Sequence, residues 1–360
     1  MKKTVYIFLS LLMLASCAKT ETPSTNQKNK RFFDAWVSRM FRQPEELEPY
    51  GPYMEKSGDN PGAGDPVDDS LFVRVRYTAW NVNGGIVASS EERMHRQLGD
   101  YDTTFYYGPV IWSTKDAAAT IAGLRMSFDD MHIGGKRKIA IPGWLNMLED
   151  HNHAVDYFNS KTEPGDIRLY EYEILDATRD ITRWCVDSVA RFVAAHPACP
   201  YAKSAADVPT EDARFVRCGA ETKDTTALGF WYQSLKNPTV GKYMPVDTTV
   251  LVNYVGRLLN GQVFDTNIKD TAKKYDPKWS SKTYSPMKIK FGKDYTDLKA
   301  ISSNNTESSL IRGFTYAVRH MGPDEWGVAL FHQGMGYAGT ATDKIPAYCP
   351  LMFELRLVKQ

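Results

Sequence analysis

The pattern of apolar and polar positions predicts a chain built largely from short strands. Residues 71–80 alternate apolar and polar side chains, as a half-buried strand does. Between Tyr254 and Asp265, two short apolar runs meet at Asn260-Gly261, and an Asn-Gly pair in that position is a strong signal for a tight hairpin. Tyr254 and the pair Phe264-Asp265 are therefore expected on neighbouring strands.

The hairpin pattern occurs twice along the chain. YTAWNVNGGIVASS, which starts at Tyr77, matches YVGRLLNGQVFDTN, which starts at Tyr254, and each has Asn-Gly six residues after its Tyr. Residues 121–142 match residues 311–332 with Gly and Met in register, and both segments read as a helix followed by a strand. Residues 167–177 and the final LMFELRLVK are the expected closing strands. The sequence thus predicts two copies of one α+β unit.

Two amphipathic helices are predicted outside these copies. Residues 31–41 carry an apolar stripe at helical spacing and end before Pro44, and we expect this helix to pack on the first unit or on a second copy of the chain. Residues 182–195 carry a second stripe, which Pro197 ends. This helix is expected to brace the two units, with a dimer interface as the alternative. The first strand of the second unit is expected at 229–235.

The N-terminus has the pattern of an export signal. Lys2-Lys3 precede an apolar run, and Leu14-Ala15-Ser16-Cys17 has the form of a lipoprotein cleavage box. The alternatives are a signal peptide with an incidental cysteine or a short membrane helix, although the run is shorter than the roughly 20 residues that span a bilayer. We expect residues 1–16 to be removed, Cys17 to carry lipid that binds the membrane, and residues 18–29 to form a flexible tether.

Composition agrees with a folded, exported protein of two domains. The chain has 360 residues, of which 42% are hydrophobic, and a domain usually takes about 150. Lys and Arg number 44 against 43 Asp and Glu, so no basic excess favours nucleic acid as a partner. In an oxidising compartment the remaining cysteines can pair; whether the first three form a bridge or are buried thiols stays open. They are Cys185, Cys199, Cys218 and Cys349.

A metal site is not expected. The cysteine spacing lacks the close pairs of a zinc site. His151 and His153 lie near Glu149 and Asp150, but a polar loop of this composition is more typical of a solvated turn. No other cofactor is indicated.

The last third of the chain resembles FKBP-type peptidyl-prolyl isomerases in the order and spacing of its motifs. The matching segments are YVGRLLNGQVFD (254–265), LIRGF (310–314), GYAG (336–339) and KIPAYCPLMFELRLV (344–358). With the internal repeat, the resemblance implies an α+β fold of two FKBP-like domains, each a curved antiparallel β-sheet wrapped around a short α-helix, joined by a helical linker. The implied segments are 17–45 (lipidated tether and helix), 46–178 (N-terminal domain), 179–220 (linker) and 221–360 (C-terminal domain).

The resemblance also implies a site in the C-terminal domain. Asp265 and Tyr337 are the implied catalytic residues. Asp265 would lie at the rim of the pocket, and the Tyr337 hydroxyl would form a hydrogen bond to the substrate. The Ile311 N–H would hold the peptide. The implied substrate-binding residues are Tyr254, Phe264, Ile311, Phe314, Ile345 and Phe353. Phe314 stands where the family most often has Trp, and Met287 stands where another aromatic is usual. The alternative is that these aromatic residues only fill a core.

The first copy departs from this pattern. Val87-Ala88 replace Phe264-Asp265, and Leu124 replaces Phe314, so both the aromatic pocket and its carboxylate are expected to be lost. We read this copy as non-catalytic.

The expected function is therefore prolyl isomerisation of exported, proline-containing polypeptides by a lipid-anchored protein of the cell envelope, at the outer membrane of a Gram-negative bacterium. The alternative is a non-catalytic FKBP-fold lipoprotein that binds peptides or acts as a chaperone or scaffold. A homodimer is left open.

Replacing Cys17 by Ser tests the anchor. Because the thiol is the attachment point for lipid, the Cys17→Ser precursor should stay unacylated and move from the detergent phase to the aqueous phase. Phase partitioning of the two proteins measures this, and unchanged partitioning would exclude a lipid on Cys17.

Overall fold

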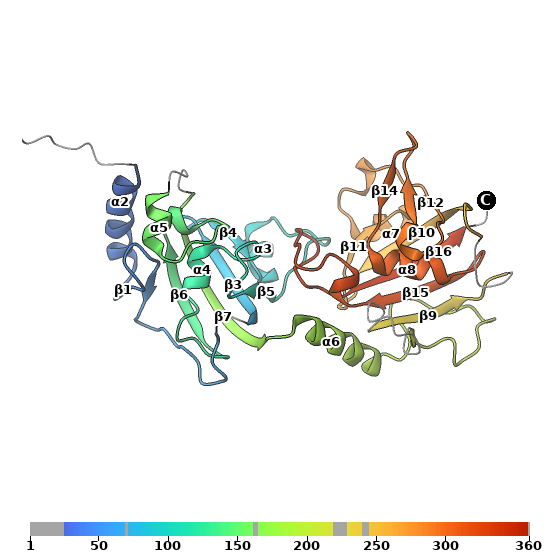
Figure 1. Cartoon of the computed structure of the whole chain (residues 1–360), viewed down its shortest axis with the longest axis horizontal. Helices are drawn as coiled ribbons and strands as arrows, with labels where there is room; N and C mark the ends of the chain where they lie inside the picture. The colour runs from blue at the N-terminus through green and yellow to red at the C-terminus, as the bar shows by residue number, and fades with distance from the viewer. Residues whose placement is uncertain (1–24, 69–70, 161–164, 219–228, 240–244, 359–360) are drawn as a thin grey trace, which may run out of the picture.

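The computed structural model describes residues 25–68, 71–160, 165–218, 229–239 and 245–358. Within these residues the strands form two antiparallel sheets, one of seven strands and one of nine (Figure 1). The sheets and their helices are consistent with the FKBP-like domains expected from the sequence. Cys17 and the predicted signal lie outside the described residues.

The first sheet has the order β1-β2-β6-β7-β3-β4, with β5 also paired to β3. Its strands are β1 (Pro44–Glu46), β2 (Tyr53–Glu55), β3 (Phe72–Trp80), β4 (Ile86–Ser89), β5 (Val110–Ser113), β6 (Lys136–Ile141) and β7 (Arg168–Thr178). The helices of this half are α2 (Thr25–Met40), α3 (Glu92–Leu98), α4 (Ala122–Met126), η1 (Gly143–Leu145) and α5 (Ala154–Asn159).

The second sheet has the order β14-β13-β12-β10-β16-β15-β9-β8, with β11 also paired to β10. Its strands are β8 (Val216–Cys218), β9 (Phe230–Lys236), β10 (Thr249–Arg257), β11 (Val263–Thr266), β12 (Met287–Lys290), β13 (Lys299–Ile301), β14 (Glu307–Ser309), β15 (Trp326–Phe331) and β16 (Leu351–Val358). The helices are α7 (Lys269–Tyr275), η3 (Trp279–Ser281), η4 (Tyr295–Asp297), α8 (Arg312–His320) and η5 (Gln333–Met335).

The predicted internal repeat is confirmed by the strand pairing. Strand β3 pairs with β7, β4 and β5, and β10 pairs with β16, β11 and β12 in the same arrangement. Both hairpins have a register shift at the same point, between Ala79 and Trp80 and between Gly256 and Arg257. A bulge of this kind re-aims the side chains beyond it.

The second hairpin is wider than the expected tight turn. Arg257 pairs with Val263, so five residues connect the strands. The Leu258 N–H donates to the Gln262 carbonyl at 2.9 Å, and Gly261 takes the left-handed conformation (φ 89°) that its position requires. The Asn260-Gly261 pair therefore predicts the position of the turn correctly, but with the bulge at Gly256 and Arg257 the turn is longer than two residues.

The helix predicted at 31–41 is present but longer. It begins at Thr25, so the flexible tether predicted for residues 18–29 is wrong for residues 25–29. Phe33 and Val37 are buried in the first core, which confirms packing on the first unit. Among the described residues, no helix is both long and apolar enough to cross a membrane.

Helix α6 (Ile181–Ala195) forms where the second stripe was predicted and runs from the end of β7 along the second sheet (Figure 1). Val189 and Val193 pack with residues of β9, β15 and β16. In the first two turns, Ile181 and Cys185 join a small cluster that includes Phe72 of the first sheet and Tyr348 of the second half. The stripe is thus covered within the chain.

The open question about cysteine pairing is answered for two of the residues. Cys185 and Cys199 are buried thiols, and the structure forms no bridge between them. Burial raises the pKa of Cys185 to about 12, so its thiol stays protonated and unreactive near neutral pH.

Equivalent glycines set how closely each short helix approaches its sheet. A Cβ on Gly123 would lie 2.4 Å from the Ile141 side chain, and a Cβ on Gly313 would lie 2.4 Å from the Phe331 ring. These distances are far below normal van der Waals contact, so only glycine permits the observed helix position.

Gly313→Ala should therefore destabilise the fold. Overpacking typically costs about 1–3 kcal/mol, which exceeds the roughly 1 kcal/mol that Ala gains over Gly in a helix. The urea midpoint should fall, whereas Arg312→Ala, an exposed change one residue earlier, should shift it little. Equal midpoints for Gly313→Ala and wild type would contradict the close contact.

Candidate functional site

The predicted substrate-binding aromatics come together on the second sheet. Phe264, Phe314 and Phe353 are buried, at 4%, 3% and 4% exposure. The Phe314 and Phe353 rings lie 5.3 Å apart at 88°, and the Phe264 and Phe353 rings lie 5.6 Å apart at 79°. Edge-to-face pairs of this kind are favourable for aromatic rings. Ile345 is buried in the same core, at 6% exposure.

Tyr254 connects this apolar cluster to its polar edge. Its ring lies 5.8 Å from the Phe314 ring at 87°, and its hydroxyl donates a 2.7 Å hydrogen bond to Asp265 Oδ2. The Thr266 N–H donates to the other carboxylate oxygen at 2.9 Å. Asp265 is exposed, so one carboxylate is held at the border between solvent and the apolar cluster.

The two tyrosines of the predicted site lie within the electrostatic field of this carboxylate. Burial, and then the negative charge and hydrogen bond of Asp265, raise the pKa of Tyr254 well above that of free tyrosine. Burial and Asp265 also raise the pKa of Tyr337. Tyr337 is 40% exposed, and its interaction with Asp265 places it near this carboxylate.

Ile311 immediately precedes helix α8. Its backbone is extended (φ −65°, ψ 144°), and it is partly buried against the second core. The first N–H groups of a helix have no partners within the helix. Among the described residues, the Ile311 N–H has no backbone acceptor, and its contact with a peptide stays a prediction.

Gly256 is required by this packing, and the sequence analysis missed it. A Cβ on Gly256 would lie 2.6 Å from the Phe264 ring and 3.2 Å from the Phe353 ring. Glycine at the bulge therefore lets the two rings meet across β10. A glycine inside an alternating strand is the signal that could have indicated it. The first copy has Ala79 at the equivalent position.

A loop from the first half borders the site, and the sequence did not indicate it. Thr103 Oγ1 donates to the Tyr275 carbonyl at 2.5 Å, and the Gln262 side-chain amide donates to the Phe105 carbonyl. Thr104 lines a small cavity of about 10 Å³ together with Phe264 and Asp265.

The first copy has aromatic rings around Tyr77, the residue equivalent to Tyr254. Val87, Ala88 and Leu124 do replace the pocket residues of the second copy. However, Tyr77 lies 5.0 Å from Trp112 and 6.3 Å from Tyr170, ring to ring. Strands β5 and β7 therefore place aromatic rings beside Tyr77, while the loss of the prolyl pocket and its carboxylate in this copy stays a prediction.

The histidines considered as metal ligands have carboxylate neighbours. His151 Nε2 lies 3.2 Å from Glu149 Oε2, and His153 Nδ1 lies 3.6 Å from Glu48 Oε2. Among the described residues, no three His, Cys, Asp or Glu side chains come together as a metal site.

Comparisons with known proteins give weak similarities. No protein-family model matches the sequence, and no curated protein matches it. The three FKBP domains of wheat FKBP73 share 15% identity, with 88% of this chain and 98% of that chain covered, at a TM-score of 0.29. A peptidyl-prolyl cis-trans isomerase from Pseudomonas syringae pv. tomato shares 21% (49% and 94% covered, TM-score 0.27), and FkpA from Escherichia coli shares 17% (49% and 71% covered, TM-score 0.29). These TM-scores are too low to support a function, so the functional proposal rests on the site itself.

The raised pKa of Tyr254 predicts how stability changes at high pH. The unfolded chain loses the phenolic proton first, near pH 10, so the contribution of Tyr254 is complete below about pH 10 and is lost as pH rises further. Tyr254→Phe should therefore reduce the loss of unfolding free energy above pH 10, by at most about 1.4 kcal/mol per pH unit. Urea titrations at several pH values measure it, with Tyr275→Phe as the exposed control. Parallel slopes for Tyr254→Phe and wild type would contradict the burial of this hydroxyl.

Proposed function

We propose that the second sheet carries a peptidyl-prolyl cis-trans isomerase site of the FKBP type. The observation that carries the proposal is the cluster of Phe264, Phe314 and Phe353, bordered by the hydrogen-bonded pair of Tyr254 and Asp265. The rings are packed together, and we place the prolyl ring at the edge of this cluster, beside the carboxylate of Asp265.

The chemistry of this reaction requires no nucleophile, metal or proton transfer. An X–Pro bond isomerises over tens to hundreds of seconds because the amide must twist and lose its resonance. The twisted amide is less dipolar than the planar one, so an apolar surface that excludes water favours the transition state over the ground state. Aromatic packing is therefore the main catalytic device in this proposal.

Each side chain has a role in this arrangement. Phe314 forms the floor beneath the prolyl ring, and Phe264, Phe353, Tyr254 and Ile345 form the walls. The Ile311 N–H and the Tyr337 hydroxyl hold the peptide by hydrogen bonds.

Asp265 places negative charge near the twisting carbonyl. The Tyr254 hydroxyl and the Thr266 N–H occupy one oxygen each and so fix the orientation of the carboxylate.

The cellular role follows from the N-terminal pattern. With a lipid on Cys17, the protein would act in the cell envelope, at the outer membrane of a Gram-negative bacterium, on exported polypeptides that contain proline. The same proposal includes a homodimer of this chain.

A non-catalytic FKBP-fold peptide-binding or chaperone protein is the second candidate. The observation that favours it is a cavity of about 690 Å³, which is lined by other residues and lies away from the aromatic cluster. We give catalysis precedence because the described residues that line the 690 Å³ cavity include no side-chain hydrogen bond between a tyrosine and a carboxylate like that of Tyr254 and Asp265.

Point variants of the mature chain test catalysis. Asp265→Ala and Phe314→Ala should each lower kcat/KM on Ala-Pro or Leu-Pro peptides in a protease-coupled assay. Removing a preorganised electrostatic group can cost about a hundredfold, and an exposed rim carboxylate should cost less.

Asp270→Ala, which removes an exposed carboxylate from α7, is the matched control and should leave the rate unchanged. Circular dichroism should show that all variants are folded. A wild-type chain that gives no acceleration over the uncatalysed rate would remove the enzyme proposal and leave the binding protein.

A further inference from the structure

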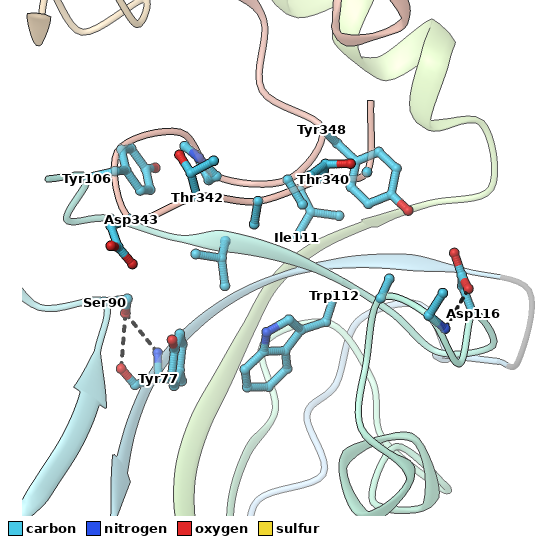
Figure 2. Close-up of a pocket in the computed structure, with 18 of the residues that line it drawn as sticks. Tyr77, Ser90, Tyr106, Ile111, Trp112, Asp116, Thr340, Thr342, Asp343 and Tyr348 are labelled. Atoms are coloured by element: carbon cyan, nitrogen blue, oxygen red, sulfur yellow. Dashed lines mark hydrogen bonds between the residues drawn. The ribbon is translucent and has the colours of Figure 1, made fainter. Parts of the chain in front are cut away.

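A cleft lies between the two halves of the chain, outside the proposed isomerase site. Its volume is about 690 Å³, within the range of pockets that bind ligands (Figure 2). One wall comes from the first half, namely β3, the end of β4, β5 and the loops on either side of β5, and Leu148. The other comes from residues 339–343 and 346–348 of the second half. We call it the inter-sheet cleft.

The chemistry of the cleft is aromatic and acidic. Tyr77, Tyr106 and Trp112 line it, and the Tyr77 and Trp112 rings lie 5.0 Å apart at 49°. Asp116 and Asp343 also line it, whereas the described lining residues include no lysine, arginine or histidine. A cavity with this lining favours a cation and disfavours an anion.

The two carboxylates lie at different ends of the cleft. Figure 2 shows Asp343 near Tyr106, Ser90 and Tyr77 at one end, and Asp116 near Tyr348 at the other. The Tyr106 N–H donates to the Asp343 carbonyl at 3.2 Å, which holds the two halves together at the first end. Both carboxylates are exposed; Asp116 Oδ1 accepts a 2.9 Å hydrogen bond from the Ala118 N–H.

A lysine or arginine side chain is the group that fits the end at Asp343. Aromatic faces attract such cations, and the attraction adds to that of a carboxylate. The volume is larger than one side chain requires, and Ile111 and Trp112 offer apolar surface beside the acidic end. This combination matches a short stretch of polypeptide rather than a free inorganic cation.

We propose that the inter-sheet cleft binds an extended basic peptide segment, with a lysine or arginine side chain at Asp343, Tyr77 and Tyr106 and an apolar residue over Trp112 and Ile111. The binding does not depend on isomerase activity. One loop contributes to both sites, since Ile345 packs in the aromatic cluster and Asp343 lines the cleft. If the proposed function also holds, a single client can therefore contact both.

Fluorescence anisotropy with the mature chain tests the proposal. The probes are labelled peptides without proline, Gly-Leu-Lys-Leu-Gly and the same sequence with Gln in place of Lys. We expect the Lys peptide to bind at least about threefold more tightly, and Asp343→Asn to weaken its binding about three- to tenfold without affecting the Gln peptide. Tyr77→Leu should reduce the same preference.

Two control variants distinguish binding in the inter-sheet cleft from binding elsewhere on the protein. Asp270→Asn makes the same charge change on exposed α7, and Asp265→Ala alters the isomerase site; neither should change binding of the Lys peptide. Equal binding of the Lys and Gln peptides to wild type would overturn the proposal. The proposal would also be overturned if Asp270→Asn weakened binding as much as Asp343→Asn. Competition for the labelled peptide by lysine methylamide as strong as that by the unlabelled peptide would overturn it too.

Discussion

The contact between Gly313 and Phe331 fixes the geometry on which the second site depends. The Phe331 ring lies directly beneath Gly313 and stacks on Phe353 at 5.9 Å and 4°. On its other side it stacks on Phe230 at 6.0 Å and 1°. Because α8 presses on this ring, Phe314 in the next position of the helix meets Phe353 edge to face. Burial of each ring contributes about 1.5–3 kcal/mol, so apolar burial is a main source of the layer's stability.

The first half has the same close approach of a helix glycine to its sheet, but the surface around it is different. Gly123 approaches Ile141 as Gly313 approaches Phe331, so both helices sit equally close to their sheets. The two copies differ at the rim of the site, because Ala79 and Ala88 occupy the positions of Gly256 and Asp265. The second half keeps a charged rim over packed rings, whereas the first half faces a loop of its neighbour across an open cleft. One fold thus supports two kinds of surface in one chain.

Local patterns were sufficient to predict strands such as β3, β7 and β16, the repeat, and the position of Tyr254 and Asp265 on neighbouring strands. Each of these depends on residues close in sequence, such as an alternating run or an Asn-Gly turn. The loop at 103–106, the rings around Tyr77 and the role of Gly256 were not predicted, because they depend on contacts between distant segments. The start of α2 was also missed, since Thr25 to Asn29 lack apolar periodicity and are helical only as an extension of the stripe at Phe33 and Val37.

The most direct test of the central claim is to observe where a proline-containing peptide binds. With isoleucine δ1-methyl groups labelled in the protein, an Ala-Leu-Pro-Phe peptide should shift the NMR signals of Ile311 and Ile345 in a saturable way. The signal of Ile111, which lines the inter-sheet cleft, should stay unchanged. Saturable shifts confined to Ile111, or no shift at Ile311 and Ile345, would contradict a prolyl site on the second sheet.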